Sequence, residues 1–463
     1  MLYAESRFGS RHEKARPSGH PLESTLGLRS AKRAAAEVAT STSEQVPRSR
    51  QRWRPLRALV KLRALEALQY REYRLLWYGQ IFASMGTWMD QVTRGWLIYE
   101  LTDSALQLGL VRGIQAIPFL LLSPIAGSTA DRYSRKFQVV SAQFASGVIF
   151  ILTALMIFAG QIRPWHVYVT ALAMACVQVF LQPSRAAMIS DSVPPANLTN
   201  AIGLNAVVFN MARSTGPALA GVLISLFDTG IAYAVQGMFF VLATVWTVQL
   251  RSAATVKRHS SQRESFAQSI LEGWKFSWRT EEVRIGLLIV LFASLFMIPF
   301  STLLPVFARD LLDVGAKGQG LLLTSMGVGA LCSSLLIASV GDRMPRGILM
   351  IAGVALYGVL VVIFAASTWF SLSMAVMAII GLCHVSSHAL VQTVIQTYSP
   401  PELRGRTIAI FHMTQVILLA GGMLVGALSA VIGAPQAAAS LSIVGTLCMV
   451  GLYIALPRAR LIR

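Results

Sequence analysis

The sequence is poor in charged residues. Only 13% of its 463 residues are Asp, Glu, Lys or Arg, whereas 54% are hydrophobic. Soluble domains of ordinary composition carry about 25% charged residues. This composition therefore excludes a water-soluble globular protein and indicates that most of the chain faces a lipid bilayer.

Cysteine is also scarce, and other features are missing altogether. The four cysteines all lie in long apolar runs, so a disulfide scaffold is excluded and buried free thiols are expected. There is no glycine-rich loop ending in Lys and Ser or Thr, which excludes direct ATP coupling through a phosphate loop. There is also no soluble segment large enough for a catalytic domain. We expect no enzymatic activity, no cofactor and no resident metal.

What the chain has in abundance is apolar runs long enough to cross about 30 Å of hydrocarbon, which takes about 20 residues of helix. In lipid every backbone polar group must be satisfied within its own segment, so each run is predicted to be an α-helix. We expect an all-α membrane protein with twelve such spans: 73–99, 105–130, 137–160, 165–189, 201–226, 230–250, 285–308, 317–340, 347–367, 370–397, 407–431 and 436–457.

The net charge of +19 is unevenly distributed. Basic residues gather in the N-terminal tail and in alternate loops, such as DRYSRK at 131–136 and DRMPR at 342–346. The opposite loops are short and nearly balanced. This pattern argues against nucleic-acid binding, and the positive-inside rule predicts a multi-pass protein of the plasma (inner) membrane with both termini in the cytoplasm.

Three segments lie outside the spans. Residues 1–54 are rich in Ser, Ala and Arg and are predicted to be a disordered cytoplasmic tail without a signal peptide. Residues 55–72 carry leucines at every third position among basic residues, which predicts an amphipathic helix on the anionic inner leaflet. Residues 251–284 are predicted to be a cytoplasmic linker, and 458–463 a second cytoplasmic tail.

Two marks recur along the chain. ADRYSRK at 130–136 returns as GDRMPRG at 341–347, and SVPPANLTNAIG at 192–203 returns as YSPPELRGRTIA at 398–409. Asp131 and Asp342 are 211 residues apart, and Pro194 and Pro400 are 206 apart. The similar offsets indicate two six-helix bundles, 73–250 and 285–457, related by a parallel repeat.

The motifs give the chain a family. Over residues 65 to 457 it resembles the major facilitator superfamily, and within it the group of the enterobactin exporter and macrolide efflux proteins. The stretches that carry the resemblance are EYRLLWYGQIFASMGTWMDQV, WLIYELTDSALQLGL, IPFLLLSPIAGSTADRYSRK and PELRGRTIAIF. The resemblance implies two pseudo-symmetric bundles, the major facilitator fold.

Two signatures of that superfamily can be placed on this chain. Its loop signature G-x-x-x-D-R-x-x-R-K is matched by Gly127, Asp131, Arg132, Arg135 and Lys136. Its antiporter signature on the fifth helix is matched in part, with Ala212 and Ala220 in place of two glycines. The matching residues are Gly203, Gly216, Pro217 and Gly221. Export is therefore favoured.

The loop signature predicts an inner latch. The expected repeat geometry brings Asp131 beside the start of the eleventh helix near Arg406, where the helix dipole and the guanidinium both attract a carboxylate. Asp342 and Arg343 would mirror this contact in the second bundle. The alternative is that the loop only fixes topology through its positive charge.

Ionisable groups inside a membrane are costly and are functional candidates. Asp90 on the first span and Arg112 on the second lie at similar depths and can pair, while Arg94, one turn from Asp90, is a competing partner. We expect Asp90 to take up and release a coupling proton as an arginine leaves and approaches. The alternative is a permanent ion pair that fixes packing.

A polar ridge marks the tenth span. His384, His388 and Gln392 are spaced by four residues and share one helix face. The repeat offset maps the two histidines onto Gln178 and Gln182 of the fourth span, so both ridges are predicted to line a central cavity. Helix–helix hydrogen bonding and zinc binding by the histidines are alternatives.

Two further arginines are predicted to have simpler roles. Arg185 and Arg213 are placed towards the cytoplasmic ends of the fourth and fifth spans, where snorkelling or pairing at a gate would explain them.

These expectations combine into a secondary transporter, a proton-driven exporter of amphipathic small molecules of drug or siderophore type that works by alternating access. Its expected partners are a small-molecule substrate, protons and membrane lipids, and a monomer is expected. Two alternatives are a lysophospholipid flippase and a non-transporting membrane receptor or scaffold.

Overall fold

The computed structural model describes residues 63–251, 266–340 and 346–456, and every element in these ranges is a helix. Within them, the side chains of a few residues lie outside the description: 63, 64, 124, 127, 128, 130–132, 266–270, 338–340, 386, 401, 402 and 415. The predicted tails 1–54 and 458–463 also lie outside it.

The N-terminal group contains six long helices, which begin and end close to the predicted spans. They are α2 (Arg71–Thr102), α3 (Ala105–Arg132), α4 (Arg135–Phe158), α5 (Pro164–Asp191), α6 (Leu198–Leu226) and α7 (Thr229–Val248). The turn from α2 to α3 takes two residues, with Asp103 in the left-handed conformation at φ 48°. Such a residue ends a helix and reverses the chain.

The C-terminal group also has six long segments, but its first is interrupted. It starts as α9 (Glu281–Phe292) and continues through η4 (Ala293–Met297), η5 (Ile298–Leu303), α10 (Leu304–Val306) and η6 (Phe307–Leu311). Pro299 and Pro305 lie in this stretch, and each lacks the N–H that a regular helix needs. The other five are α11 (Gly315–Val340), α12 (Arg346–Ala366), α13 (Phe370–Tyr398), α14 (Pro401–Ile432) and α15 (Ala434–Ala455).

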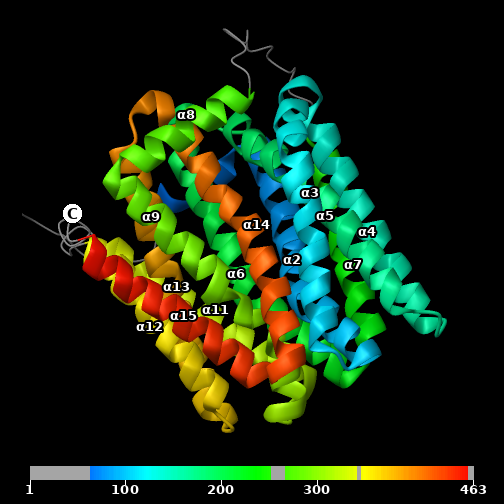
Figure 1. Ribbon diagram of the computed structural model, residues 1–463. Helices are drawn as coiled ribbons and strands as arrows, with labels where there is room; N and C mark the ends of the chain where they lie inside the picture. The colour runs from blue at the N-terminus through cyan, green and yellow to red at the C-terminus, as the bar shows by residue number, and fades with distance from the viewer. Residues whose placement is uncertain (1–62, 252–265, 341–345, 457–463) are drawn as a thin grey trace, which may run out of the picture. The chain divides into compact units, whose positions relative to one another are not determined.

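The segment between the groups contains α8 (Phe266–Arg279), which lies across the top of the view in Figure 1. This helix was not expected in the predicted linker 251–284. Its exposed side includes Trp274 and Trp278, whose rings stack at 5.9 Å, and it packs on the start of α14 near Arg406. Where 55–72 was predicted to be an amphipathic helix, Arg63–Gln69 forms the 3₁₀ helix η2, whose Ala67 N–H donates to Asn200 of α6.

Eleven helices of the described chain are long and apolar enough to cross a membrane. The first predicted span, now α2, is not among them because its middle carries Asp90, Gln91 and Arg94. The all-helical membrane fold is confirmed, and the twelfth span stays a prediction. Of the four cysteines, all are unpaired, but only Cys383 is buried and Cys332 is exposed, so the expectation that all are buried was wrong.

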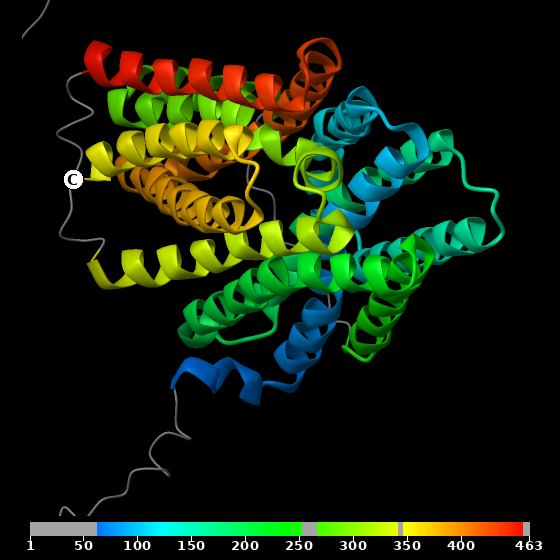
Figure 2. The ribbon, with the colours of Figure 1, turned by 90° about the horizontal axis from the view of Figure 1, so that it is seen from below.

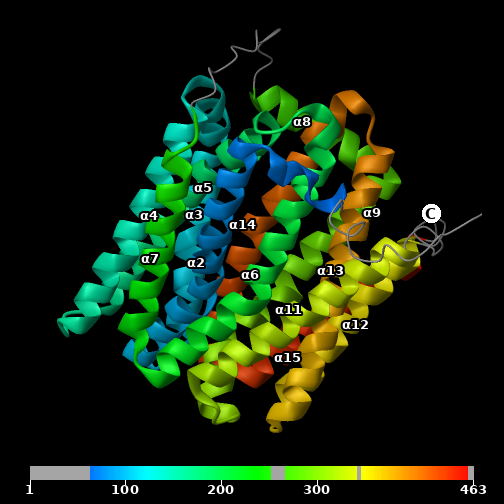
Figure 3. The same cartoon turned by 180° about the vertical axis from the view of Figure 1, so that it is seen from behind.

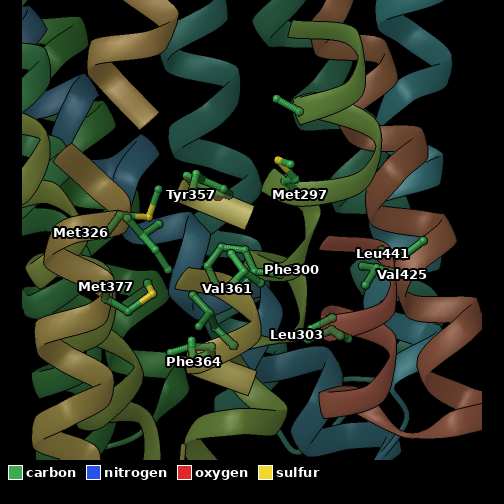
Figure 4. Close-up of a cluster of buried hydrophobic side chains, with 14 of the residues drawn as sticks. Met297, Phe300, Leu303, Met326, Tyr357, Val361, Phe364, Met377, Val425 and Leu441 are labelled. Atoms are coloured by element: carbon green, nitrogen blue, oxygen red, sulfur yellow. The ribbon is translucent and has the colours of Figure 1, made fainter. Parts of the chain in front are cut away.

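The interior of the C-terminal group is filled with large apolar side chains (Figure 4). The Phe300 ring lies 5.6 Å from that of Phe364 and 6.2 Å from that of Tyr357, both edge-on. Met326 and Met377 fill the space beside them. In lipid such packing holds helices together mainly through van der Waals contact.

The two groups lie side by side, with α15 on one side and α3 to α5 on the other (Figure 2). They meet along two helix pairs, α3 with α14 and α6 with α11; the second pair is visible in Figure 3. At both crossings glycine allows the backbones to approach. A Cβ at Gly109 would meet the backbone of Gly422 and Gly426, and one at Gly320 would meet the carbonyl of Pro217.

These crossings lie towards one end of the helices. We call it the Asp103 end, formed by the turns near 103, 227, 313 and 433; the other end, with the turn near 133, is the Tyr133 end. Every described glycine whose Cβ would touch the other group lies in the half nearer the Asp103 end. The groups are therefore closely packed there.

Candidate functional site

Three side chains of the N-terminal group gather at mid-depth. The guanidinium carbon of Arg213 on α6 lies 5.6 Å from the centre of the Trp88 ring on α2, and Trp88 packs edge-on against Phe209 at 5.4 Å. A guanidinium over an indole face is a favourable cation–π contact. Among the described residues, Arg213 has no carboxylate partner.

Four polar side chains of the C-terminal group gather at a similar depth. His384 and His388 on α13 lie 6.0 Å apart, between the rings of Tyr357 and Phe411. A small cavity is lined by Tyr357, both histidines and Ser387, together with apolar residues of α9, η4 and α12. Both histidines therefore face a cavity inside the C-terminal group, and a cavity between the two groups lined by the histidine ridge stays a prediction.

The two clusters lie at a similar depth, on helices that both pack against α11. A Cβ at Gly327 of α11 would meet Ser214, the neighbour of Arg213 on α6, and a Cβ at Gly381 of α13 would meet the backbone of Met326 on α11. We call the following residues the central site: Trp88, Arg213, Tyr357, His384, Ser387 and His388.

The central site lies near the middle of the bundle. Trp88 is fourteen residues before the end of α2, Arg213 is thirteen before the end of α6, and His384 is fourteen after the start of α13. At 1.5 Å per residue each lies about 20 Å from the Asp103 end. The expected position of Arg213 near the cytoplasmic end was wrong, since it is at mid-helix, and Arg185 is only 7% exposed and so does not snorkel.

A second cavity lies between α2, α3 and the interrupted segment, closer to the Asp103 end. Its lining includes Asp90, Arg94 and Arg112, with Ser301 and Thr302 from the C-terminal group. Asp90 pairs with Arg94, four residues along α2, through two contacts of 2.9 Å. The competing partner therefore holds the carboxylate.

Arg112 is held differently from the predicted pairing. Its guanidinium donates to Gln91 at 2.9 Å and to Gln115 at 3.4 Å, and not to Asp90. Arg94 also donates to Thr170 of α5. The i,i+4 spacing brings Arg94 to Asp90 within one helix, whereas a contact from α3 would depend on how the two helices are rotated. Arg112 and Asp90 nevertheless line the same cavity.

A polar cluster joins the two groups at the Asp103 end, and it was missed from the sequence. Tyr99 donates to Asp310, and Arg309 pairs with both Asp103 and Asp310. The Arg309 guanidinium also lies 4.3 Å over the Tyr99 ring. The signal was present in YELTDS and ARDLLD, two short loops with acidic residues, but nothing in the sequence shows that these loops meet.

The inner latch lies largely outside the described residues. This applies to the side chains of Asp131 and Arg132, to Gly127, and to all of Asp342 and Arg343. The described members have their own partners. Arg135 pairs with Asp191 at the end of α5, Lys136 donates to the Leu250 carbonyl, and Arg406 pairs with Glu272 of α8.

The antiporter-like residues lie mostly at helix contacts. A Cβ at Gly216 would meet Trp88 of α2, while Pro217 and Gly221 face Gly320 and Ala316 of α11. Gly203 has open space around it. Three of the four residues therefore lie where two helices approach closely. Gly216 lies beside Trp88 of the central site, and Pro217 and Gly221 lie between the two groups.

The three predicted glutamines do not line either of the two cavities. Gln178 and Gln392 are half-buried, Gln182 is exposed, and the linings of the two cavities above include none of them. Among the described residues no group of three or more His, Cys, Asp or Glu could hold a metal ion.

The family described as "Transmembrane secretion effector" matches residues 63–461, nearly all of the helical chain. The chain belongs to this family of major facilitator transporters. This membership confirms the resemblance found in the sequence and identifies a transporter and not an enzyme.

Individual relatives in this transporter family cover much of the chain. It is 27% identical over 409 residues to the uncharacterized MFS-type transporter YfiS of Bacillus subtilis (strain 168), covering 83% of this chain and 94% of that one. It is 22% identical to the staphyloferrin A transporter of Staphylococcus aureus (strain NCTC 8325 / PS 47), covering 55% and 64%. It is 25% identical to the multidrug efflux pump Tap of Mycobacterium tuberculosis (strain ATCC 25618 / H37Rv), covering 75% and 84%.

A solved structure has the same fold. It is a bacterial homolog of the human lysosomal transporter Spinster, in an inward-facing and unoccupied conformation. The TM-score is 0.66 at 13% identity, and the match covers 87% of this chain and 98% of that one. This similarity supports the major facilitator fold of this multi-pass membrane protein.

Proposed function

We propose that this transporter exports amphipathic small molecules across the plasma (inner) membrane by proton-driven alternating access. The observation that carries the proposal is the central site, whose residues come from both helix groups and lie at mid-depth, beyond the tightly packed Asp103 end. A ligand there contacts both groups and is released on one side or the other as they rock. Relatives named as a multidrug efflux pump and a staphyloferrin A transporter support a small-molecule substrate.

The direction of opening follows from the positive-inside pattern. With both termini in the cytoplasm, the Asp103 end faces outwards, so the described packing closes the outer side. Export then requires the α3–α14 and α6–α11 crossings to open while the Tyr133 end closes. The loop that contains Asp131 would join the halves at the Tyr133 end in that second state.

The coupling proton is assigned to Asp90. It lines the second cavity, and its side chain is 15% exposed beside the nearly buried Arg94. Protonation would release Arg94 from its only carboxylate partner among the described residues and so favour a different packing of α2 against α5 and the interrupted segment. The coupling proton and the ligand therefore both act at the boundary between the two helix groups.

Inverted membrane vesicles test the function. With a pH gradient imposed, acid inside, we expect uptake of at least one member of a panel of amphipathic dyes and siderophores, and its loss when the gradient is collapsed. Vesicles without the protein are the control. Movement of lysophospholipid that is insensitive to the gradient would instead identify a flippase, and no transport of any compound would remove the proposal.

A further inference from the structure

The deep charges of the described bundle do not balance. Four arginines lie at least six residues from either end of their helix: Arg94, Arg112, Arg185 and Arg213. Asp90 is the one carboxylate at such depth among the described side chains of the two helix groups, and Arg94 occupies it. Buried cations are unfavourable without a partner, so this excess of positive charge calls for an anion.

The central site shows the same imbalance in its hydrogen bonds. Three buried donors of the central site have no partner among the described atoms: Trp88 Nε1, Tyr357 Oη and Ser387 Oγ. Tyr357 and Ser387 are each 2% exposed and line the cavity beside the histidines. Buried donors are normally satisfied, so a group of unsatisfied ones marks the place of a missing acceptor.

A carboxylate fits this set of donors. It carries one negative charge to match one guanidinium, it accepts hydrogen bonds and donates none, and its two oxygens can take a bidentate arginine contact. The rings of Trp88 and Phe209 and the apolar lining of the cavity, which includes Val354 and Val391, offer an apolar surface for the rest of the molecule. The site is therefore complementary to an acid with an apolar body.

Arg185 extends the same chemistry towards the Tyr133 end. It is 7% exposed on α5, and its Nε and Nη2 atoms have no partner among the described residues. It lies six residues before the end of α5, so an anion passing from the Tyr133 end to the central site meets a second unpaired guanidinium.

We propose that the substrate is an amphipathic carboxylate, bound at the central site by Arg213 with Tyr357 on the opposite helix group. This inference rests on the proposed transport function and names the charge of its substrate. A cationic amphiphile of the same shape would place a positive charge beside Arg213 and would be rejected.

Matched pyrene probes test the charge preference at equilibrium. Pyrenebutyrate, its neutral methyl ester and pyrenebutylamine share one aromatic body, and their binding to purified full-length protein in detergent can be followed by fluorescence anisotropy. We expect the carboxylate to bind at least tenfold more tightly than the amine, with the ester between them. Equal or tighter binding of the amine, or no binding of the carboxylate, would overturn the inference.

Two variants connect the preference to the site. Arg213→Gln should weaken carboxylate binding about tenfold or more, because a charge-assisted contact is lost, and should leave the amine unchanged or improved. Tyr357→Phe should weaken carboxylate binding several-fold and leave the amine unaffected. The matched control Arg74→Gln removes an exposed arginine of α2 and should change nothing.

Folding and transport are measured separately. Gel filtration and thermal melting identify any variant that fails to fold, and Arg213→Lys, which retains the charge, should keep most of the preference. If Arg213→Gln folds and binds the carboxylate as well as the parent does, the inference fails. If vesicles transport a cationic dye as well as an anionic one, the exporter function still holds and only the inference of a carboxylate substrate fails.

Discussion

Asp90 and Arg94 form an ion pair one turn apart inside α2, with the arginine 3% exposed and the carboxylate 15% exposed. The pair has two possible roles, a proton carrier or a fixed packing element. They differ in what happens when both charges are removed together. A packing pair can be replaced by neutral partners, since removing one buried charge is far more costly than removing both.

Asp90→Asn should therefore abolish transport driven by a pH gradient. It should also lower the free energy of unfolding, by about 3 kcal/mol for an arginine left buried without its partner. The double variant Asp90→Asn with Arg94→Gln should recover thermal stability without recovering gradient-driven transport in vesicles. Normal coupled transport by the double variant would show that the pair serves packing alone.

The sequence predicted which individual residues are polar and deep in the helices, but not how they pair. Asp90 and the two arginines could be identified from composition and depth, while the choice of Arg94 over Arg112 depends on helix rotation. Arg213 was assigned to a helix end, although counting along α6 places it in the middle. The unpartnered donors of Trp88 and Tyr357 could not be predicted, because a missing partner is visible only in three dimensions.

Among the elements, long helices were the most predictable. Their bounds follow from apolar runs that end at turn residues, and predicted and described ends differ by a few residues, as for 370–397 and α13. Two elements were missed. Pro299 and Pro305 signal the interruption of the seventh segment, and Leu271, Trp274 and Trp278 give α8 an apolar face that its polar surroundings obscured.

The charge of Asp131, at the loop between α3 and α4, is expected to matter for transport. Asp131→Asn should lower transport at least tenfold while the protein still inserts normally, because the proposed latch at the Tyr133 end would lose its charged contact with the start of α14. Transport in vesicles gives the rate. Thiol labelling of a single cysteine placed at the exposed Tyr133 verifies the orientation. An unchanged rate would leave the loop with a purely topological role.

For the whole molecule, the closed Asp103 end is held by two kinds of contact. The glycine crossings bury backbone against backbone, whereas Arg309 and Asp103 are 35% and 72% exposed. Exposed ion pairs contribute at most about 1 kcal/mol each. The polar cluster therefore aligns the two groups without making the closed state irreversible.

Locking that end should stop the transport cycle. We expect Asp103→Cys with Arg309→Cys, in a variant whose four native cysteines are serine, to lose transport when treated with a short bis-methanethiosulfonate, which links the two thiols through disulfides. A reductant should restore it, and pyrenebutyrate binding should persist. Each single-cysteine variant, treated in the same way, serves as the control. Full transport by the crosslinked protein would contradict alternating access through the Asp103 end.

The two bundles could be predicted from the repeated marks at 131 and 342, but their meeting surfaces could not. Gly216, Pro217 and Gly221 were recognised as a signature, yet only the structure shows that Pro217 and Gly221 contact α11. The partner glycines of α14 and α11 carry no motif, and glycine is common throughout the chain. The contact surfaces between the two bundles become visible only when both bundles are folded and packed together.

The unbalanced guanidinium of Arg213 has an electrical consequence. Arg213 lies near the middle of α6. A rearrangement that changes the side of the membrane from which its guanidinium is accessible therefore moves a positive charge within the transmembrane field. One elementary charge crossing 100 mV changes energy by about 2.3 kcal/mol. The conformational change of the empty transporter would therefore depend on the membrane voltage. The same change would not depend on voltage when a bound acid neutralises the charge of Arg213.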